Sequence, residues 1–574
     1  MTLSTLDWII IIFFLILFAG IGIYVSKRAG KDSNEFFLSG RNMPWWLLGV
    51  SMVATTFAAD TPNLVAGIVR QDGVFGNWIW WSFLLTGMLT VFFYAKLWRK
   101  SGITTDLEFY ELRYSGKSAA FLRGFRAIYL GVFFNIVIMA NVCLAAIKIG
   151  HVMFGFTTFQ TLFIASIVTV IYSAFGGLKG VLLTDFVQFI IAMVGSVWAA
   201  VFIVNMPEIG GLDNLFSSPI VSSKTMMLPD FSNSDMLIPL LIIPLAVQWW
   251  SVWYPGAEPG GGGYIAQRML AAKDEKHATY ATLFFNVAHY AIRPWPWILI
   301  GLASLVIFPN IESLQAAFPD LEAIYVKDDL SYPAMLTYLP AGLLGIVITS
   351  LIAAFMSTIS THLNWGSSYV VNDVYKRFVK PNATDKEQVL LGRISTVVMM
   401  ILAALLATIL EEARDAFNLM LQVGAGTGLL FILRWFWHRI NPYSEITAMI
   451  VSFIIAIFFF INGKMESPIV EMVGHQQLIF GVVVTTICWI IVSLITKPSN
   501  DDTLQSFNAL IFGEDSKFKG FGNKIMCFFS GVIGVYCALF AIGKFIYKDF
   551  GIAFLLLGIM AICSLVIIKL IRKI

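Results

Sequence analysis

Charged residues are scarce in this chain. Asp, Glu, Lys and Arg make up 13% of its 574 residues, whereas 58% are hydrophobic and the mean hydropathy is +0.79. So few charges could not cover a large soluble enzyme, and the composition instead predicts a polytopic membrane protein. The net charge of +3 says nothing about partners until each charge is assigned to one side of a membrane.

Cysteine and catalytic motifs are scarce as well. The five cysteines all lie in apolar runs without metal-ligand spacing, which predicts buried thiols rather than disulfides or a zinc site. The sequence has no His-rich cluster, no phosphate-binding loop and no nucleophile–base pair at a meaningful spacing, so we expect no enzymatic activity. Its basic residues lie in short loops between apolar runs, which implies no nucleic-acid partner.

Long apolar runs dominate the chain, and about fifteen of them have bilayer length. They cover residues 6–26, 45–68, 77–98, 122–150, 157–176, 181–206, 236–265, 279–308, 336–371, 388–411, 414–437, 444–463, 474–496, 524–547 and 549–570. Asp7 precedes the first run and Lys27 and Arg28 follow it, the reverse of a secretory signal. The distribution of Lys and Arg predicts an integral protein of the plasma or inner membrane, with the N-terminus outside and the C-terminus cytoplasmic.

Two of these runs are interrupted. The second contains Asp60 and Pro62, and the seventh contains two prolines and four consecutive glycines between residues 255 and 263. Unwound backbone is tolerated in a membrane only where it lines a cavity or is buried in protein. The two breaks lie five spans apart, so the blocks that they begin have opposite orientations. Broken helices at matching positions of inverted repeats indicate the binding site of a transporter.

This pattern predicts the following organisation. Residues 1–44 form an extra helix and a loop, 45–206 the first five-helix repeat, and 207–235 an outside loop. Residues 236–443 form the second, inverted repeat with an outside loop near 309–335, and 444–574 form additional C-terminal helices. The loops leave no room for a soluble signalling domain, which argues against a sensor.

Hydroxyl side chains gather inside the apolar stretch 349–375. Helical spacing places Ala354, Ser357, Ser360 and Thr361 on one face, with Thr358 about 100° round the helix. Such hydroxyls can let helices pack closely or bond back to their own helix. They can also hold Na⁺, a hard cation that prefers oxygen ligands. Spacing alone leaves both interpretations open.

Several segments resemble the sodium:solute symporter family, over about residues 5–500. They are FFLSGRNMPWWLLGVSMVATTFAAD at 36–60, YSAFGGLKGVLLTDFVQF at 172–189, YIAQRMLAAKDEKHA at 264–278 and the stretch 353–375. Gly180 departs from the Ser, Ala or Pro that is usual in the family. The resemblance implies an all-α polytopic membrane protein with a LeuT-type five-plus-five inverted repeat, additional N- and C-terminal helices, and Na⁺ as coupling ion.

The resemblance also implies sodium ligands. The site common to the fold would use the carbonyls of Ala54, Phe57 and Ala354 and the hydroxyls of Ser357 and Thr358. A second sodium, held in some members, would use Asp185, Ser357, Ser360 and Thr361. An unpaired carboxylate inside a span is costly, and a bound cation would relieve that cost for Asp185. Alternatively, Asp185 pairs with Lys179 or caps a helix.

The solute is less clearly indicated. Sugar carriers of this family place an acidic residue and Gln in the first broken helix, where this chain has Asp60 and Thr61. In the second break, GAEPGGGG replaces the segment that binds sugar in relatives, and it contains Glu258. Trp253 and Tyr254 precede it; their rings either stack on a solute or belong to an interfacial belt.

Three further polar side chains lie inside spans. His289 and Arg293 share one helix face, and Arg293 either grips a substrate carboxylate or pairs permanently with Asp60 or Glu258. Gln422 is a solute ligand or makes a helix–helix hydrogen bond.

Together these features predict a sodium-coupled symporter that imports a small organic solute, a sugar or a sugar acid such as a uronate or sialate. A symporter of amino acids or carboxylates and a transporter-like sensor are the alternatives. Its expected partners are the solute and membrane lipids; the sequence gives no oligomeric state.

Overall fold

The computed structural model describes residues 3–29, 33–56, 58–252, 258–410, 413–463, 465, 467–513, 517 and 519–573. These residues form eleven helical segments that are long and apolar enough to cross a membrane. A twelfth span is the bent pair of α3 (Trp45–Thr56) and α4 (Asp60–Asp72), whose axes differ by 57°. The all-α membrane architecture expected from the sequence is confirmed.

The remaining predicted spans are shorter or broken helices. The predicted spans 157–176 and 181–206 are the two parts of one helix, α11 (Thr158–Val204), which is kinked at Gly177, where φ is +54°. A left-handed φ favours glycine, so the kink falls where the chain can make it without a Cβ clash. Residues 414–437 form α23 (Ala413–Gly424) and α24 (Gly428–Leu433).

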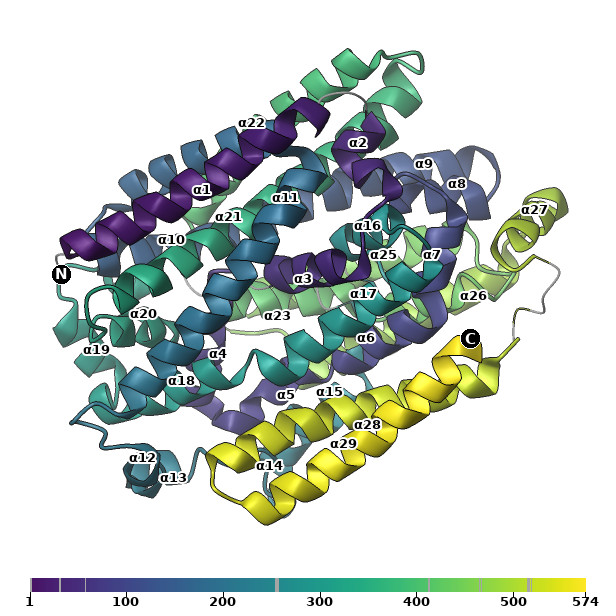
Figure 1. Cartoon of the computed structure of the whole chain (residues 1–574). Helices are drawn as coiled ribbons and strands as arrows, with labels where there is room; N and C mark the ends of the chain where they lie inside the picture. Colours follow the sequence, from purple (N-terminus) through teal and green to yellow (C-terminus); the bar gives the residue numbers. More distant parts are fainter. Residues whose placement is uncertain are drawn as a thin grey trace.

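Helix α21 (Leu343–Tyr369) carries the hydroxyl-rich stretch and is buried along most of its length. It packs against α11, α1 (Thr5–Ala29), α10 (Asn135–Phe154) and α22 (Asp385–Ala407), and Figure 1 shows α1, α11 and α21 running side by side. Asp7 of α1 accepts hydrogen bonds from the backbone N–H groups of Gly342 and Gly345, each at 2.8 Å. The carboxylate thus satisfies amides at the start of α21 that have no partner within the helix.

Both predicted breaks are present. Helix α4 begins at Asp60 with Pro62 in its first turn, where the missing N–H of proline costs no helical hydrogen bond. In the seventh span, Ser234–Trp250 ends before the break and α16 (Gly263–Ala271) begins after it. Gly260 and Gly261 have φ of +88° and +98°, which explains the need for glycine there.

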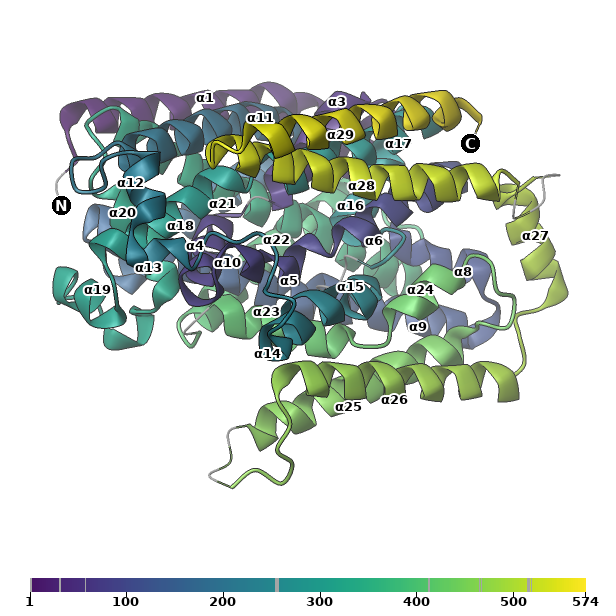
Figure 2. The same ribbon diagram turned by 90° about the horizontal axis from the view of Figure 1, so that it is seen from below.

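The C-terminal helices lie at the periphery. Helices α25 (Pro442–Asn462) and α26 (Gly474–Ile495) pack on each other, as do α28 (Phe521–Ile546) and α29 (Phe550–Leu570). Figure 2 shows the two pairs on different sides of the helical body. The two termini lie at opposite ends of the helices (Figure 1).

Candidate functional site

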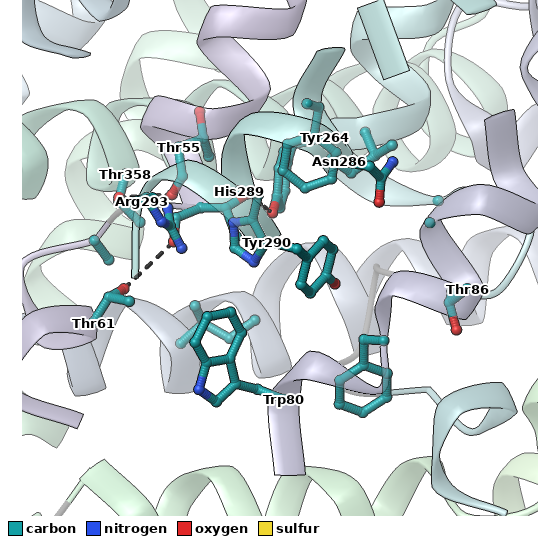
Figure 3. Close-up of a pocket in the computed structure, with 18 of the residues that line it drawn as sticks. Thr55, Thr61, Trp80, Thr86, Tyr264, Asn286, His289, Tyr290, Arg293 and Thr358 are labelled. Atoms are coloured by element: carbon teal, nitrogen blue, oxygen red, sulfur yellow. Dashed lines mark hydrogen bonds between the residues drawn. The ribbon is translucent and has the colours of Figure 1, made fainter. Parts of the chain in front are cut away.

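A cavity of about 180 Å³ lies between the two broken helices. Helices α3, α4, α5 (Trp78–Trp81), α6 (Leu84–Leu89), α10 and α21 contribute to its lining. The second break with α16, and α17 (Glu275–Val287) with the π-helical turn Ala288–Ile292 that follows it, contribute as well. Figure 3 shows labelled side chains from these elements converging on it. The lining includes these solute-binding candidates: Asp60, Thr61, Glu258, His289 and Arg293.

The remaining solute candidates are Gln422, Trp253 and Tyr254. Gln422 does not line the cavity; its side-chain amide donates to Gln477 Oε1 of α26 at 2.9 Å. This contact is the helix–helix hydrogen bond that we expected for Gln422 as the alternative to solute binding. Trp253 and Tyr254 lie outside the described residues.

The charged groups of the cavity are each engaged. Asp60 Oδ2 accepts a hydrogen bond of 2.9 Å from Asn141 Nδ2. Arg293 donates to the carbonyl oxygen of Val53 at 3.3 Å, and its guanidinium lies over the ring of Trp297, 5.1 Å from the centroid. Glu258 is paired with Arg126 of α9 (Gly116–Ile128). The sequence suggested a permanent pair of Arg293 with Glu258, but the partner of Glu258 is Arg126.

Four lining residues keep an acceptor oxygen without a hydrogen-bond partner among the described residues. The atoms are Asp60 Oδ1, Asn141 Oδ1, Glu258 Oε2 and Asn286 Oδ1. All four atoms are buried. Leaving a buried acceptor without a hydrogen bond costs about 1–3 kcal/mol of free energy. A ligand that donates hydrogen bonds to these oxygens removes that cost, which favours its binding.

Sequence reasoning missed several lining residues. Asn141 and Asn286 are amides inside apolar runs, and that polarity was the signal that could have marked them. Trp80 and Tyr290 stack with ring centroids 6.0 Å apart and planes inclined by 25°. Tyr264 shares a hydrogen bond of 2.8 Å with Thr56 at the end of α3. Among the described residues, the aromatic side of the cavity therefore includes Trp80, Tyr264 and Tyr290.

The residues expected to bind the first sodium lie where α3 approaches α21. Thr358 donates its hydroxyl to the carbonyl oxygen of Thr55 at 2.9 Å. Ala54 and Ala354 are buried on the same two helices, whereas Phe57 lies outside the described residues. A hydroxyl of α21 thus already meets a carbonyl at the end of the broken helix.

The residues expected to bind a second sodium form a buried polar cluster around Asp185. This carboxylate accepts hydrogen bonds from Ser357 at 2.6 Å and from Ser51 at 2.5 Å. Ser360 donates back to the carbonyl of Ser357 at 3.1 Å. The guanidinium of Arg268 lies 4.0 Å from Asp185, so the cation beside this carboxylate is Arg268 rather than Lys179. The hydroxyl of Thr361 accepts a hydrogen bond from the same guanidinium at 2.8 Å.

An ionic network connects the π-helical segment Val370–Val379, which directly follows α21, to the loop helices α8 (Phe109–Arg113) and α9. Arg123 lies 2.7 Å from both Asp373 and Glu111, and Arg377 lies 2.7 Å from Glu111. Hydrogen bonds from Arg377 hold the pKa of Glu111 below its usual range. Burial raises the pKa of nearby Asp106 to about 6, although Tyr369 donates to it. These contacts lie at the end of the molecule opposite the N-terminus (Figure 1).

Comparison with known proteins identifies relatives of the chain. The sequence model of the sodium:solute symporter family matches residues 36–454. The sodium/glucose cotransporter of Vibrio parahaemolyticus is 26% identical over 540 residues, covering 89% of this chain and 96% of the relative. The sodium/sialic acid symporter SiaT of Proteus mirabilis is 27% identical over 480 residues, covering 79% and 91%. The osmoregulated proline transporter OpuE of Bacillus subtilis is 27% identical over 496 residues, covering 83% and 92%.

A solved structure shares the fold. The substrate-bound outward-open state of a Na⁺-coupled sialic acid symporter aligns with a TM-score of 0.69 at 22% identity, covering 87% of this chain and 99% of that one. This likeness confirms the LeuT-type five-plus-five arrangement with extra helices at both ends.

Proposed function

The chain belongs to the sodium:solute symporter family and is a sodium-coupled symporter, and we propose that it imports a sugar or a sugar acid through the cavity between its two broken helices. Sequence similarity alone does not select the solute, because glucose, sialic acid and proline transporters are equally similar to it, at 26%, 27% and 27% identity. The choice therefore depends on the chemistry of the cavity.

The set of unpaired acceptor oxygens on Asp60, Asn141, Glu258 and Asn286 carries this proposal. A sugar presents several hydroxyl donors on a compact ring, so one molecule can satisfy several of these acceptors at once. The stacked rings of Trp80 and Tyr290 add an aromatic wall, and aromatic faces pack well against the C–H faces of sugars. Arg293 would then meet the carboxylate of a sugar acid.

An amino acid is the second candidate, and one observation favours it. Asp60 and Arg293 place opposite charges on the same cavity, which suits the ammonium and carboxylate groups of a zwitterion. An amino acid, however, carries the donors of its backbone on a single ammonium group, whereas a sugar distributes its hydroxyl donors around a ring, which suits acceptors on four different residues better. We therefore place the sugar first.

For the coupling ion, we infer a sodium site formed by the carbonyls of Ala54, Phe57 and Ala354 with the hydroxyls of Ser357 and Thr358. The 2.9 Å bond from Thr358 to Thr55 supports it, because it brings a hydroxyl of the second repeat to the unwound end of the first broken helix. A second sodium would bind Asp185, Ser357, Ser360 and Thr361. Burial of Asp185 among hydroxyls supports that assignment.

Alternating access would follow from these sites. Sodium can favour the outward-facing state only by the difference in its affinity for the two states, and ligands drawn from both α3 and α21 provide such a difference. We further propose that the N-terminus lies outside and the C-terminus inside. The ionic network of Arg123, Glu111 and Asp373 would then close the cytoplasmic end while the solute enters.

Uptake into proteoliposomes tests the proposal. Purified protein is reconstituted, and labelled glucose, glucuronate, sialate and proline are supplied with an inward Na⁺ gradient or an equal K⁺ gradient. We expect uptake of one of the sugars in the Na⁺ gradient alone. Uptake of proline without any sugar would replace the proposed solute by the second candidate.

A further inference from the structure

Arg268 is a fully buried arginine that the transport site described above does not use. It lies on α16, directly after the second break, in the middle of the Asp185 cluster. Its Nη2 atom donates to Thr361 at 2.8 Å, to Ser51 at 3.2 Å and to Thr55 at 3.3 Å. The same atom lies 4.0 Å from Asp185 Oδ2.

The guanidinium of Arg268 therefore connects α16 with three other helices, α3, α11 and α21. Its hydroxyl acceptors belong to α3 and α21, and its carboxylate partner belongs to α11. Its Nη1 atom donates to the side-chain oxygen of the neighbouring Gln267 at 3.1 Å. Burying an arginine is costly unless its charge is compensated, and Asp185 is the carboxylate that compensates it here. The hydroxyl groups and the side-chain oxygen of Gln267 supply further acceptors.

The oxygens that hold Arg268 overlap with those assigned to the second sodium. Both cations would need the carboxylate of Asp185 and the hydroxyl of Thr361. Two positive charges within a few ångströms of one buried carboxylate repel each other strongly, because the interior screens them poorly. Occupation by one cation therefore excludes the other.

We propose that Arg268 is a tethered cation that competes with sodium for the Asp185 cluster and leaves it when sodium binds. This inference rests on the proposed second sodium site. Arg268 keeps Asp185 compensated while sodium is absent, and the arriving ion releases α16 from α3 and α21.

The competition between Arg268 and sodium also affects the solute cavity. Tyr264 lies one turn before Arg268 on α16, and the guanidinium lies 5.7 Å from the centroid of its ring. Tyr264 lines the cavity and shares its hydrogen bond with Thr56 of α3. Release of Arg268 therefore loosens the segment that carries a wall of the solute site, which links the ion to the solute.

The test measures sodium binding by the full-length purified protein without solute, from the dependence of tryptophan fluorescence on Na⁺ at constant ionic strength. Removal of the competing charge in Arg268→Gln should tighten sodium binding by about five- to tenfold, within the usual range of coupling between linked sites. Arg268→Lys keeps the charge and should bind sodium within about twofold of the native protein. Weaker or unchanged binding by Arg268→Gln would overturn the competition.

Two further variants keep the test decisive. Thr55→Val removes one acceptor of Arg268 that is not an assigned sodium ligand, so it should tighten sodium binding in the same direction even if Arg268→Gln does not fold. Asp185→Asn should weaken sodium binding and cancel the gain of Arg268→Gln. If Asp185→Asn leaves sodium binding unchanged, the second sodium site fails. If Asp185→Asn weakens sodium binding but Arg268→Gln and Thr55→Val do not tighten it, the second sodium site is supported and only the competition with Arg268 is wrong.

Discussion

Thr358 of α21 donates its hydroxyl hydrogen to the carbonyl oxygen of Thr55 at 2.9 Å, across the point where α3 ends. The bond connects the hydroxyl-rich helix of the second repeat to the broken helix of the first. A sodium ion between these helices would replace this single hydrogen bond by several ion–oxygen contacts. The geometry thus explains how an ion could favour one arrangement of the two repeats.

Loss of both hydroxyls should abolish coupling. In the double variant Ser357→Ala, Thr358→Ala, we expect Na⁺-dependent uptake to fall by about 100-fold or more, because two of the assigned ligands disappear and each tenfold loss is about 1.4 kcal/mol. Uptake is measured in proteoliposomes at equal protein content. Thr349→Ala is the matched control on the same helix, because the Thr349 hydroxyl donates back to the carbonyl oxygen of Gly345 at 2.7 Å and is not an assigned sodium ligand. Uptake by the double variant at the control's level would contradict the sodium assignment.

Asp185→Asn should change the number of coupled ions. The amide cannot supply the negative charge that a second sodium requires, so the Hill coefficient of uptake for Na⁺ should fall from near two to about one. The measurement is initial uptake against Na⁺ concentration. Asp235→Asn, at an exposed position, is the control. A coefficient that stays near two would remove Asp185 from the ion site.

Arg293→Gln should separate acidic from neutral solutes. A charge-assisted hydrogen bond to a carboxylate contributes roughly 1.5–3 kcal/mol, so binding of a uronate or sialate should weaken by about tenfold or more. Binding of a neutral sugar should change little, and Arg293→Lys should keep part of the preference for acids. Equal weakening of both solute classes would show that Arg293 supports the cavity through Val53 and Trp297 instead.

The buried pair of Lys148 and Asp329 should stabilise the fold. Lys148 Nζ lies 2.8 Å from each oxygen of Asp329, and both residues are buried. Asp329→Asn leaves the ammonium without its counter-charge, and breaking a buried pair typically costs about 3–5 kcal/mol. We expect a clear fall in the thermal unfolding midpoint in detergent.

A second substitution checks the cause of that loss. In the double variant Lys148→Met, Asp329→Leu, the unpaired charge is absent, so most of the midpoint should be regained. An equal loss in the single and double variants would indicate that packing, rather than charge, explains the effect.

The sequence predicted the parts of this architecture that depend on local pattern. Pro62 and the glycines before Tyr264 marked both breaks, and the hydroxyls of α21 marked a polar face. Arg268 could not be assigned, because its partner Asp185 is distant in the sequence and only the packing of both α16 and α11 against α3 and α21 brings them together. Gln422 shows the opposite case: its polarity within a span was correctly noticed, but Gln477 of α26 satisfies it.

The residues that line the cavity also divide into those that the sequence pattern marked and those that only the fold reveals. Asp60 and Arg293 were found because a charge inside a span demands an explanation. Asn141, Asn286 and Trp80 were missed because a neutral amide or a ring in an apolar run has many ordinary uses, and only the folded helices show which of them surround one cavity.

Thermal unfolding of the purified protein, in Na⁺ and in choline, with glucose, glucuronate, sialate and proline, tests the central claim most directly. A ligand that binds only the folded state raises the unfolding midpoint by mass action, so weak binding becomes visible at high concentration. We predict that a sugar or sugar acid raises the midpoint in Na⁺ and has no effect in choline. Equal stabilisation in choline would contradict sodium coupling at these sites, and stabilisation by proline alone would contradict the proposed solute.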